Sequence, residues 1–183
     1  MERAEMSEQI NINVVVDDKI FRRFAVFDSF YRKRFWVRPV IFASIMTAFS
    51  LACFVMRGFA EQAELIGCVL LAIGLGLPAA HLLRFFRTVS AQITVMGLKI
   101  PRQVYSLRLS REPDGVLAAS GGKLERYEWN GLFGAYRVAG CTYLYVNANK
   151  AYLLPDEQVE GGADALWTLL ADMLPGEKLR RRR

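Results

Sequence analysis

Two long uncharged runs, separated by eight residues, constrain this chain of 183 residues more than any other feature. They cover 39–56 (PVIFASIMTAFSLACFVM) and 65–83 (LIGCVLLAIGLGLPAAHLL). As α-helices of 18 and 19 residues, they extend roughly 27–28 Å, close to the thickness of the hydrocarbon core of a bilayer. Buried helices of a soluble bundle are the alternative, but such helices carry a polar face and neither run has one. We therefore predict two transmembrane helices, which the short connection 57–64 makes antiparallel neighbours.

Basic residues gather at the ends of these runs that are remote from the 57–64 connection. They are Arg22, Arg23, Arg32, Lys33, Arg34 and Arg38 before the first run, and Arg84 and Arg87 after the second. The connection itself contains one arginine and two glutamates. Because positively charged flanks stay in the cytoplasm, we predict that both termini are cytoplasmic and that the connection is extracytoplasmic.

The net charge of +6 has two interpretations. Nucleic acid is a common partner of basic soluble domains, but here the bases adjoin apolar runs. This placement favours a bilayer with anionic headgroups as the partner, and we expect no nucleic acid. The predicted headgroup contacts are the eight basic residues above together with Arg180, Arg181, Arg182 and Arg183. A solvated, disordered tail is the alternative interpretation of 178–183.

Small residues recur every four positions in both apolar runs. They are Ser44, Ala48 and Ala52 in the first, and Ala72, Gly76 and Ala80 in the second. Such stripes let helix backbones approach closely, so we expect them to join the two helices or to support self-association. Pro78 is expected to kink the second helix. His81 is expected to lie at the interface, with a proton-linked role as the alternative.

The segment before the first run combines a strand and a helix. Alternating and β-branched residues predict a strand over 10–16, after which Asp17 or Asp18 can cap a helix. One face of that helix would carry Ile20, Phe24, Phe27, Tyr31 and Phe35. The face either packs on the domain or the bilayer surface, or is an ordinary core-facing stripe. Residues 88–100, after the second run, fit a helix or a strand, and we favour a helix.

Strand patterns and turn signals alternate from residue 103 onward. Strands are predicted at 104–110, 116–120, 124–129, 133–138, 142–146 and 151–154, followed by a helix at 162–174. This order matches a pleckstrin-homology-like (PH-like) roll, in which a helix closes one end of a bent sheet. The predicted fold class is an α+β membrane protein, with a two-helix transmembrane hairpin inserted into a PH-like antiparallel β roll with a C-terminal helix.

The predicted segments follow from these assignments. They are 1–38 (strand and amphipathic juxtamembrane helix, part of the cytoplasmic domain), 39–56 (first transmembrane helix), 57–64 (extracytoplasmic loop), 65–86 (second transmembrane helix), 87–177 (PH-like β domain with its C-terminal helix) and 178–183 (polybasic tail).

Residues that could bind a metal or a cofactor are few and scattered. Cys53, Cys68 and Cys141 form no CxxC pair, and His81 is the single histidine, so we predict no metal site. Glycine pairs such as Gly121-Gly122 fit neither a P-loop nor a dinucleotide fingerprint, so we predict no cofactor.

Catalytic pairs are equally hard to assemble. The acids worth testing are Asp114, Glu125, Glu128, Asp156 and Glu157. Asp114 adjoins a turn, and Asp156 and Glu157 follow a strand end, where carboxylates are usually solvated. No serine or threonine of the domain has a histidine beside it in sequence, since the single histidine lies at membrane level. We therefore predict no catalytic residues and no enzyme activity.

Aromatic residues are the most distinctive local feature of the domain. The candidate partner-binding face consists of Arg126, Tyr127, Trp129, Arg137, Tyr143 and Tyr145. Exposed tyrosine and arginine are effective anchors for a protein partner. In the alternative interpretation, about half of the aromatic side chains alternate inward and fill the core of a small sheet.

Several short motifs resemble the YcxB-like family of bacterial membrane proteins. They are Asp114-Gly115-Val116, Tyr127-Glu128-Trp129 leading to Leu132, Tyr143-Leu144-Tyr145, and Tyr152-Leu153-Leu154-Pro155, together with the two-span hairpin. The resemblance implies a PH-like domain split by its membrane hairpin, and it implies no catalytic residues. The family commonly has a basic residue soon after the proline, whereas Asp156-Glu157 follow it here. An anion-binding role at that position is therefore not carried over.

The sequence thus predicts a multi-pass protein of the bacterial cytoplasmic (inner) membrane with a non-catalytic binding module at the membrane surface. The module would bind a protein partner or a second copy of the chain. One alternative is an immunity or resistance protein against a membrane-active peptide. Another is an oligomeric transport or channel component, against which the nearly charge-free runs argue.

Overall fold

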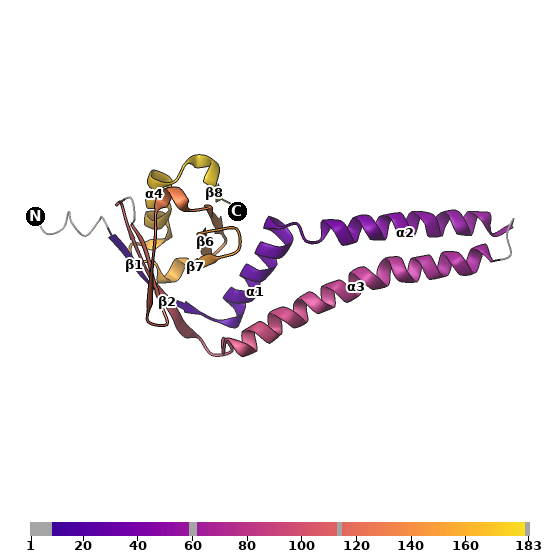
Figure 1. Ribbon diagram of the computed structural model, residues 1–183, viewed down its shortest axis with the longest axis horizontal. Coiled ribbons are helices and arrows are strands. Elements are labelled where there is room, and N and C mark those ends of the chain that lie inside the picture. Colours follow the sequence, from indigo (N-terminus) through magenta and orange to yellow (C-terminus); the bar gives the residue numbers. More distant parts are fainter. Residues whose placement is uncertain (1–8, 59–61, 113–114, 182–183) are drawn as a thin grey trace, which may run out of the picture. The chain divides into compact units, whose positions relative to one another are not determined.

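The computed structural model describes residues 9–58, 62–112 and 115–181, which belong to two compact units (Figure 1). The β unit combines the chain up to Ile20 with the chain from Leu98 onward, and the helical unit is Phe21–Gly97. The helical unit is therefore an insertion within the sequence of the β unit.

Two long antiparallel helices dominate the helical unit (Figure 1). They are α2 (Val37–Val55) and α3 (Ala63–Val95), preceded by α1 (Asp18–Val26) and a π-helix (Phe27–Arg32). Both α2 and α3 are long and apolar enough to cross a membrane, which confirms the prediction of two apolar helices. In the 18-residue apolar stretches of α2 and α3, only 6% and 11% of the residues are buried. Helices in the core of a soluble bundle would be mostly buried, so this exposure disfavours that alternative.

The second long helix extends well beyond its apolar run. It continues to Val95 and includes Pro78, so the favoured helix after residue 88 is confirmed up to that point. The predicted boundary at residue 86 therefore lies inside the helix. The charges of Arg84 and Arg87, on either side of that boundary, do not end the helix. The chain first turns at Gly97, which has a φ of 67°, and Pro101 follows.

Contact between α2 and α3 depends on two glycines of α3. A Cβ atom added at Gly74 would lie 2.6 Å from the Cβ of Met46, and one at Gly67 would lie 3.2 Å from the carbonyl oxygen of Ser50. The Ser50 hydroxyl also donates a buried hydrogen bond of 2.7 Å to the Gly67 carbonyl. The helices thus approach each other where α3 has no side chain.

The small-residue stripes predicted to join the helices do not do so. All six of their residues are exposed: Ser44, Ala48, Ala52, Ala72, Gly76 and Ala80. The stripes are on the outer surface because the contact is made through Gly67 and Gly74 instead. Their alternative use in self-association stays a prediction.

Two four-stranded sheets form the β unit. The first has the order β1-β2-β3-β4, formed by Gln9–Val16, Arg102–Ser110, Val116–Ser120 and Lys123–Tyr127. The second has the order β7-β6-β5-β8, formed by Ala151–Pro155, Cys141–Tyr145, Gly134–Val138 and Leu179–Arg181. The helix α4 (Gly162–Met173) comes before β8 and buries Leu166, Leu169 and Leu170. The α+β class with antiparallel sheets is confirmed.

The polybasic tail is part of the second sheet, which the sequence did not predict. Strand β8 pairs in parallel with β5, with Ala135 opposite Leu179 and Arg137 opposite Arg181. The pairing uses backbone groups, so exposed arginine side chains do not oppose it. A Cβ atom added at Gly134 would lie 2.6 Å from the Lys178 carbonyl oxygen, which shows how closely the two segments approach. The tail interpretation is therefore wrong for 179–181.

Polar contacts connect the first sheet to β7 and to the segment that follows it. The Tyr105 hydroxyl of β2 accepts a 2.6 Å hydrogen bond from the Leu153 N–H of β7 and donates one of 3.0 Å to its carbonyl. The Gln158 side chain bonds the backbone N–H and carbonyl of Val15, where the β1–β2 register shifts by one residue. These bonds satisfy backbone groups that would otherwise be buried without partners.

We expect Gly74→Ala to destabilise the helical unit by about 1–3 kcal/mol, because the added methyl group must displace either Met46 or the α2 backbone. The matched control is Gly76→Ala on the same helix, where an added Cβ meets no atom within 4 Å. Thermal unfolding followed by helical circular dichroism compares the two. Equal midpoints would contradict the contact at Gly74.

Candidate functional site

The backbone between α1 and α2 is irregular. The π-helix Phe27–Arg32 is followed by Arg34, whose φ of 49° is the one positive value among the non-glycine residues that the structure describes. The Lys33 N–H donates to the Asp28 carbonyl at 2.9 Å, and the Phe35 N–H donates to the Ser29 carbonyl at 2.9 Å. A left-handed arginine costs roughly 1–2 kcal/mol, and such geometry is concentrated at functional sites. Short π-helices often mark such sites as well.

The predicted apolar face is only partly buried. Phe27 is buried, whereas Tyr31, four residues later, is 50% exposed, although the two rings stack with centroids 5.5 Å apart. The two side chains therefore still lie on one side of the segment, and only Phe27 is covered. Asp28 fixes this segment through ion pairs with Arg32 at 2.6 Å and with Lys33 at 2.9 Å.

Aromatic rings join this segment to α3 within the helical unit. The Phe35 ring stacks on the His81 ring, with centroids 4.5 Å apart and planes 13° apart. Phe35 and Phe30 also contact Phe85, with centroid distances of 5.9 Å and 5.2 Å. These contacts fix the segment that precedes α2 against α3, and nothing in the sequence alone brings the two segments together.

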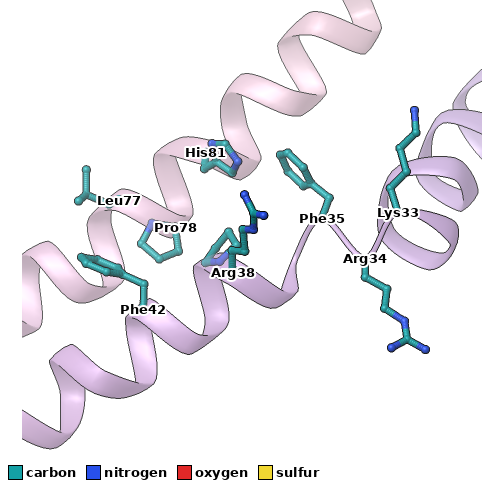
Figure 2. A pocket seen from close by; sticks show the side chains of 9 residues that line it. Lys33, Arg34, Phe35, Arg38, Phe42, Leu77, Pro78 and His81 are labelled. Atoms are coloured by element: carbon teal, nitrogen blue, oxygen red, sulfur yellow. The ribbon is translucent and has the colours of Figure 1, made fainter. Parts of the chain in front are cut away.

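A groove of about 700 Å³ opens beside this aromatic cluster, between α2 and α3 (Figure 2). We call it the basic groove, and it is lined by Lys33, Arg34, Phe35, Arg38, Pro39, Phe42, Leu77, Pro78 and His81. Three of these nine residues are basic and none is acidic. Figure 2 shows Arg38 beside the groove together with His81, while the Arg34 side chain is directed away from them.

The predicted headgroup contacts fall into several groups. Lys33, Arg34 and Arg38 line the basic groove, and Arg84 and Arg87 line a separate hollow on α3. Arg22 donates a 3.3 Å hydrogen bond to the Ser90 hydroxyl, and Arg23 is exposed on α1. Arg32 is paired with Asp28. Arg180 and Arg181 belong to β8 in the other unit, whereas Arg182 and Arg183 lie outside the described residues.

The β unit contains a second polar arrangement, the glutamate cluster, formed by Glu125, Tyr127, Lys150 and Tyr152. The Lys150 amine and the Glu125 carboxylate form an ion pair. Both tyrosine hydroxyls donate to the same carboxylate, Tyr127 at 2.6 Å and Tyr152 at 2.8 Å. The Lys150 amine also lies 5.4 Å from the centroid of the Tyr152 ring. The cluster connects β4 to β7 and to the loop before β7.

The electrostatics of the glutamate cluster are those of a stable ion pair. The Lys150 amine and then the tyrosine hydroxyls lower the pKa of Glu125 from its ordinary 4.5 to about 2. The hydrogen bond that Lys150 donates to Glu125 raises the pKa of Lys150. Burial is the main cause of the raised pKa of Tyr152. At neutral pH the carboxylate is ionised and the amine is protonated. Neither group is then suited to proton transfer, so the cluster fits a structural role.

The candidate partner-binding face is largely buried. Trp129, Tyr143 and Tyr145 are at most 2% exposed, so their predicted role in contacting a partner is wrong. Trp129 instead donates its indole N–H to the Ser110 carbonyl at 3.0 Å. The alternative interpretation, that aromatic side chains fill the core, is confirmed for Tyr143, Tyr145 and Tyr152. The expected alternation is absent from β6, because all five of its residues are buried.

The remaining members of the predicted face are separated. The Arg137 side chain, 14% exposed, donates a 2.7 Å hydrogen bond to Asp164 and is engaged within the unit. It lowers the pKa of Asp164, and it opposes the burial that raises the pKa of Asp156. Of the six residues of the predicted face, Arg126 is exposed and Tyr127 is half-buried, and both belong to β4.

The acids considered as catalytic pairs do not converge. Asp114 lies outside the described residues, Glu125 is in the glutamate cluster, and Glu128 and Glu157 are exposed. Within the described residues there is no group of three or more histidine, cysteine, aspartate or glutamate side chains that could hold a metal ion.

Comparison with protein-family models, with curated protein sequences and with solved structures gave no match. The resemblance to the YcxB-like family stays a prediction. The functional argument therefore depends on the geometry of the two units.

We expect the β unit to lose stability as the pH falls from about 4.5 to 2. Lys150 and the two tyrosines stabilise the ionised carboxylate of Glu125 and so lower its pKa, and protonation of that carboxylate removes this stabilisation. The contribution is fully present above the unfolded-state pKa, since the folded-state pKa is the lower one. Glu125→Gln should flatten this part of the pH profile, whereas Glu160→Gln, at an exposed site, should not. Urea midpoints measured at several pH values test this, and identical profiles for the two variants would count against it.

Proposed function

We propose that the protein is an integral protein of the bacterial cytoplasmic membrane, in which α2 and α3 form a transmembrane hairpin. In this proposal the β unit is a non-catalytic, cytoplasmic, PH-like module that binds a protein partner or a second copy of the chain. The observation that carries the proposal is the outward exposure of apolar side chains along both helices. Val55 is 80% exposed, Leu65 is 69% exposed and Phe49 is 60% exposed. In water such a surface is unfavourable, whereas acyl chains would cover it.

The distribution of charge supports the proposed orientation. Arg23, Arg34, Arg38, Arg84 and Arg87 are exposed at the end of the hairpin remote from the 57–64 connection. Exposed arginines at that end would meet anionic headgroups of the cytoplasmic leaflet. The exposed His81 lies near the same end and stacks on Phe35, which supports an interfacial position over a proton-linked role.

The order of elements in the β unit supports the PH-like proposal. Consecutive strands pair in antiparallel fashion within each sheet, and α4 follows them. The parallel β8 is an addition to that order. Of the predicted binding face, Arg126 and Tyr127 remain, and Leu124 beside them is 67% exposed. Strand β4 is at the edge of its sheet, where a further strand can pair with it.

We expect a cysteine introduced at Glu64, in a variant without the native cysteines, to react with a membrane-impermeant maleimide added to intact cells. Glu64 is exposed at the start of α3, next to the proposed extracytoplasmic connection. A cysteine at Glu160, in the β unit, is the control and should react only after lysis. Equal labelling of both sites in intact cells would refute the proposed topology.

We expect photo-crosslinking probes at Leu124 and Arg126 to capture one protein species in living cells, because both residues are exposed on an edge strand. A probe at Tyr145, which is 1% exposed, is the matched control and should capture nothing. Capture of the chain itself would indicate self-association. If neither exposed site captures a protein, the binding-module proposal fails, while the topology remains testable by the maleimide experiment.

A further inference from the structure

We propose that the basic groove binds a single anionic glycerophospholipid, with its phosphodiester at Arg38 and one acyl chain along Phe42 and Leu77. This inference depends on the proposed transmembrane position of α2 and α3. It differs from general attraction to a charged leaflet, because it assigns one lipid to one groove.

The groove has the two-part chemistry of an amphiphile. Arg38 is at its basic part, whereas Phe42, Leu77 and Pro78 are apolar and lie further along the hairpin (Figure 2). A free phosphate would use the basic part alone and leave the apolar part exposed to water. A phospholipid satisfies both parts, since its acyl chain can leave the groove into the surrounding bilayer.

The depth of the groove along the hairpin also fits a lipid. Arg38 stands immediately before the uncharged run 39–56, and His81 is close to the end of the second run, 65–83. Because the helices are antiparallel, these positions come together at one end, where hydrocarbon would give way to headgroups (Figure 2). Basic pockets at this depth between transmembrane helices are suited to anionic headgroups.

The two basic residues Lys33 and Arg38 differ in whether an acidic side chain neutralises their charge. Lys33 is paired with Asp28 at 2.9 Å, so part of its charge is already neutralised. Arg38 is exposed, forms no ion pair within the described residues, and has no acid among the residues that share the groove with it. A guanidinium binds a phosphodiester through two parallel hydrogen bonds, which an ammonium cannot reproduce.

The surroundings hold the groove in one shape. The Phe35–His81 stack fixes one wall, and the left-handed Arg34 sets the direction in which the chain enters α2. The cost of that conformation is offset by a preformed site, because a lipid then binds without ordering the chain. The volume of about 700 Å³ is within the roughly 300–1,000 Å³ of small-molecule sites.

Native mass spectrometry of the full chain in detergent, titrated with phosphatidylglycerol or phosphatidylcholine, tests the proposal. We expect one phosphatidylglycerol to bind preferentially and Arg38→Gln to weaken it about tenfold or more, as loss of a charge-assisted hydrogen-bond pair implies. Arg38→Lys, which keeps the charge, should have an affinity for phosphatidylglycerol between those of the unsubstituted protein and Arg38→Gln. The matched control is Arg23→Gln, which removes the same charge from an exposed position on α1 outside the groove and should change the affinity less than about twofold.

Three outcomes would overturn the proposal. Equal weakening by Arg38→Gln and Arg23→Gln would indicate general attraction to the leaflet, and equal binding of both lipids would remove the role of charge. Displacement of the lipid by inorganic phosphate at millimolar concentration would assign the groove to phosphate alone. Maleimide labelling of Glu64→Cys in the same background separates these results from failure of the transmembrane topology. Helical circular dichroism shows whether each variant is folded.

Discussion

The close approach of α2 and α3 determines where the groups at the charged end of the hairpin lie. Gly74 faces Met46 and Gly67 faces Ser50, so the two backbones come together at positions where α3 has no side chain. The Ser50–Gly67 hydrogen bond adds a directional contact that fixes the register. With that register, Phe35, two residues before α2, stacks on His81 of α3. The basic groove begins about one turn from the Gly74–Met46 contact, since Phe42 and Leu77 line it, and it therefore depends on this packing.

The sequence predicted the hairpin well but not its interface. Long uncharged runs and a short connection are enough to predict two paired helices. The interface depends on which of many small residues meets a partner, and α3 has small residues on several faces. Four-residue spacing favoured Ala72, Gly76 and Ala80, all of which are exposed. Gly67 and Gly74 are seven residues apart, and only the position of Met46 distinguishes Gly74 from its neighbours.

The β unit shows a similar division. Alternation predicted most strands, but it assumes that one face of each strand is solvated. Strand β6 is buried on both faces, so Tyr143 and Tyr145 had no sequence signal that separated them from surface anchors. Strand β8 was missed because four arginines suggest solvation, whereas backbone pairing with β5 is indifferent to them. The π-helix after α1 has no composition signal, so the sequence predicted an α-helix there.

The β unit is discontinuous in sequence, and this has a consequence for the order of synthesis. Strand β1 pairs along its whole length with β2, although residues 17–101 separate them. A ribosome therefore releases β1 long before its partner exists, and both apolar helices are made in the interval. During that interval β1 has an unpaired edge carrying Ile10, Ile12 and Val14, which is a template for aggregation. The β1–β2 pairing is complete only after both helices have been synthesised, when the returning chain reaches Ser110, opposite Gln9. A chain that stalls within α3 would leave β1 without its partner strand.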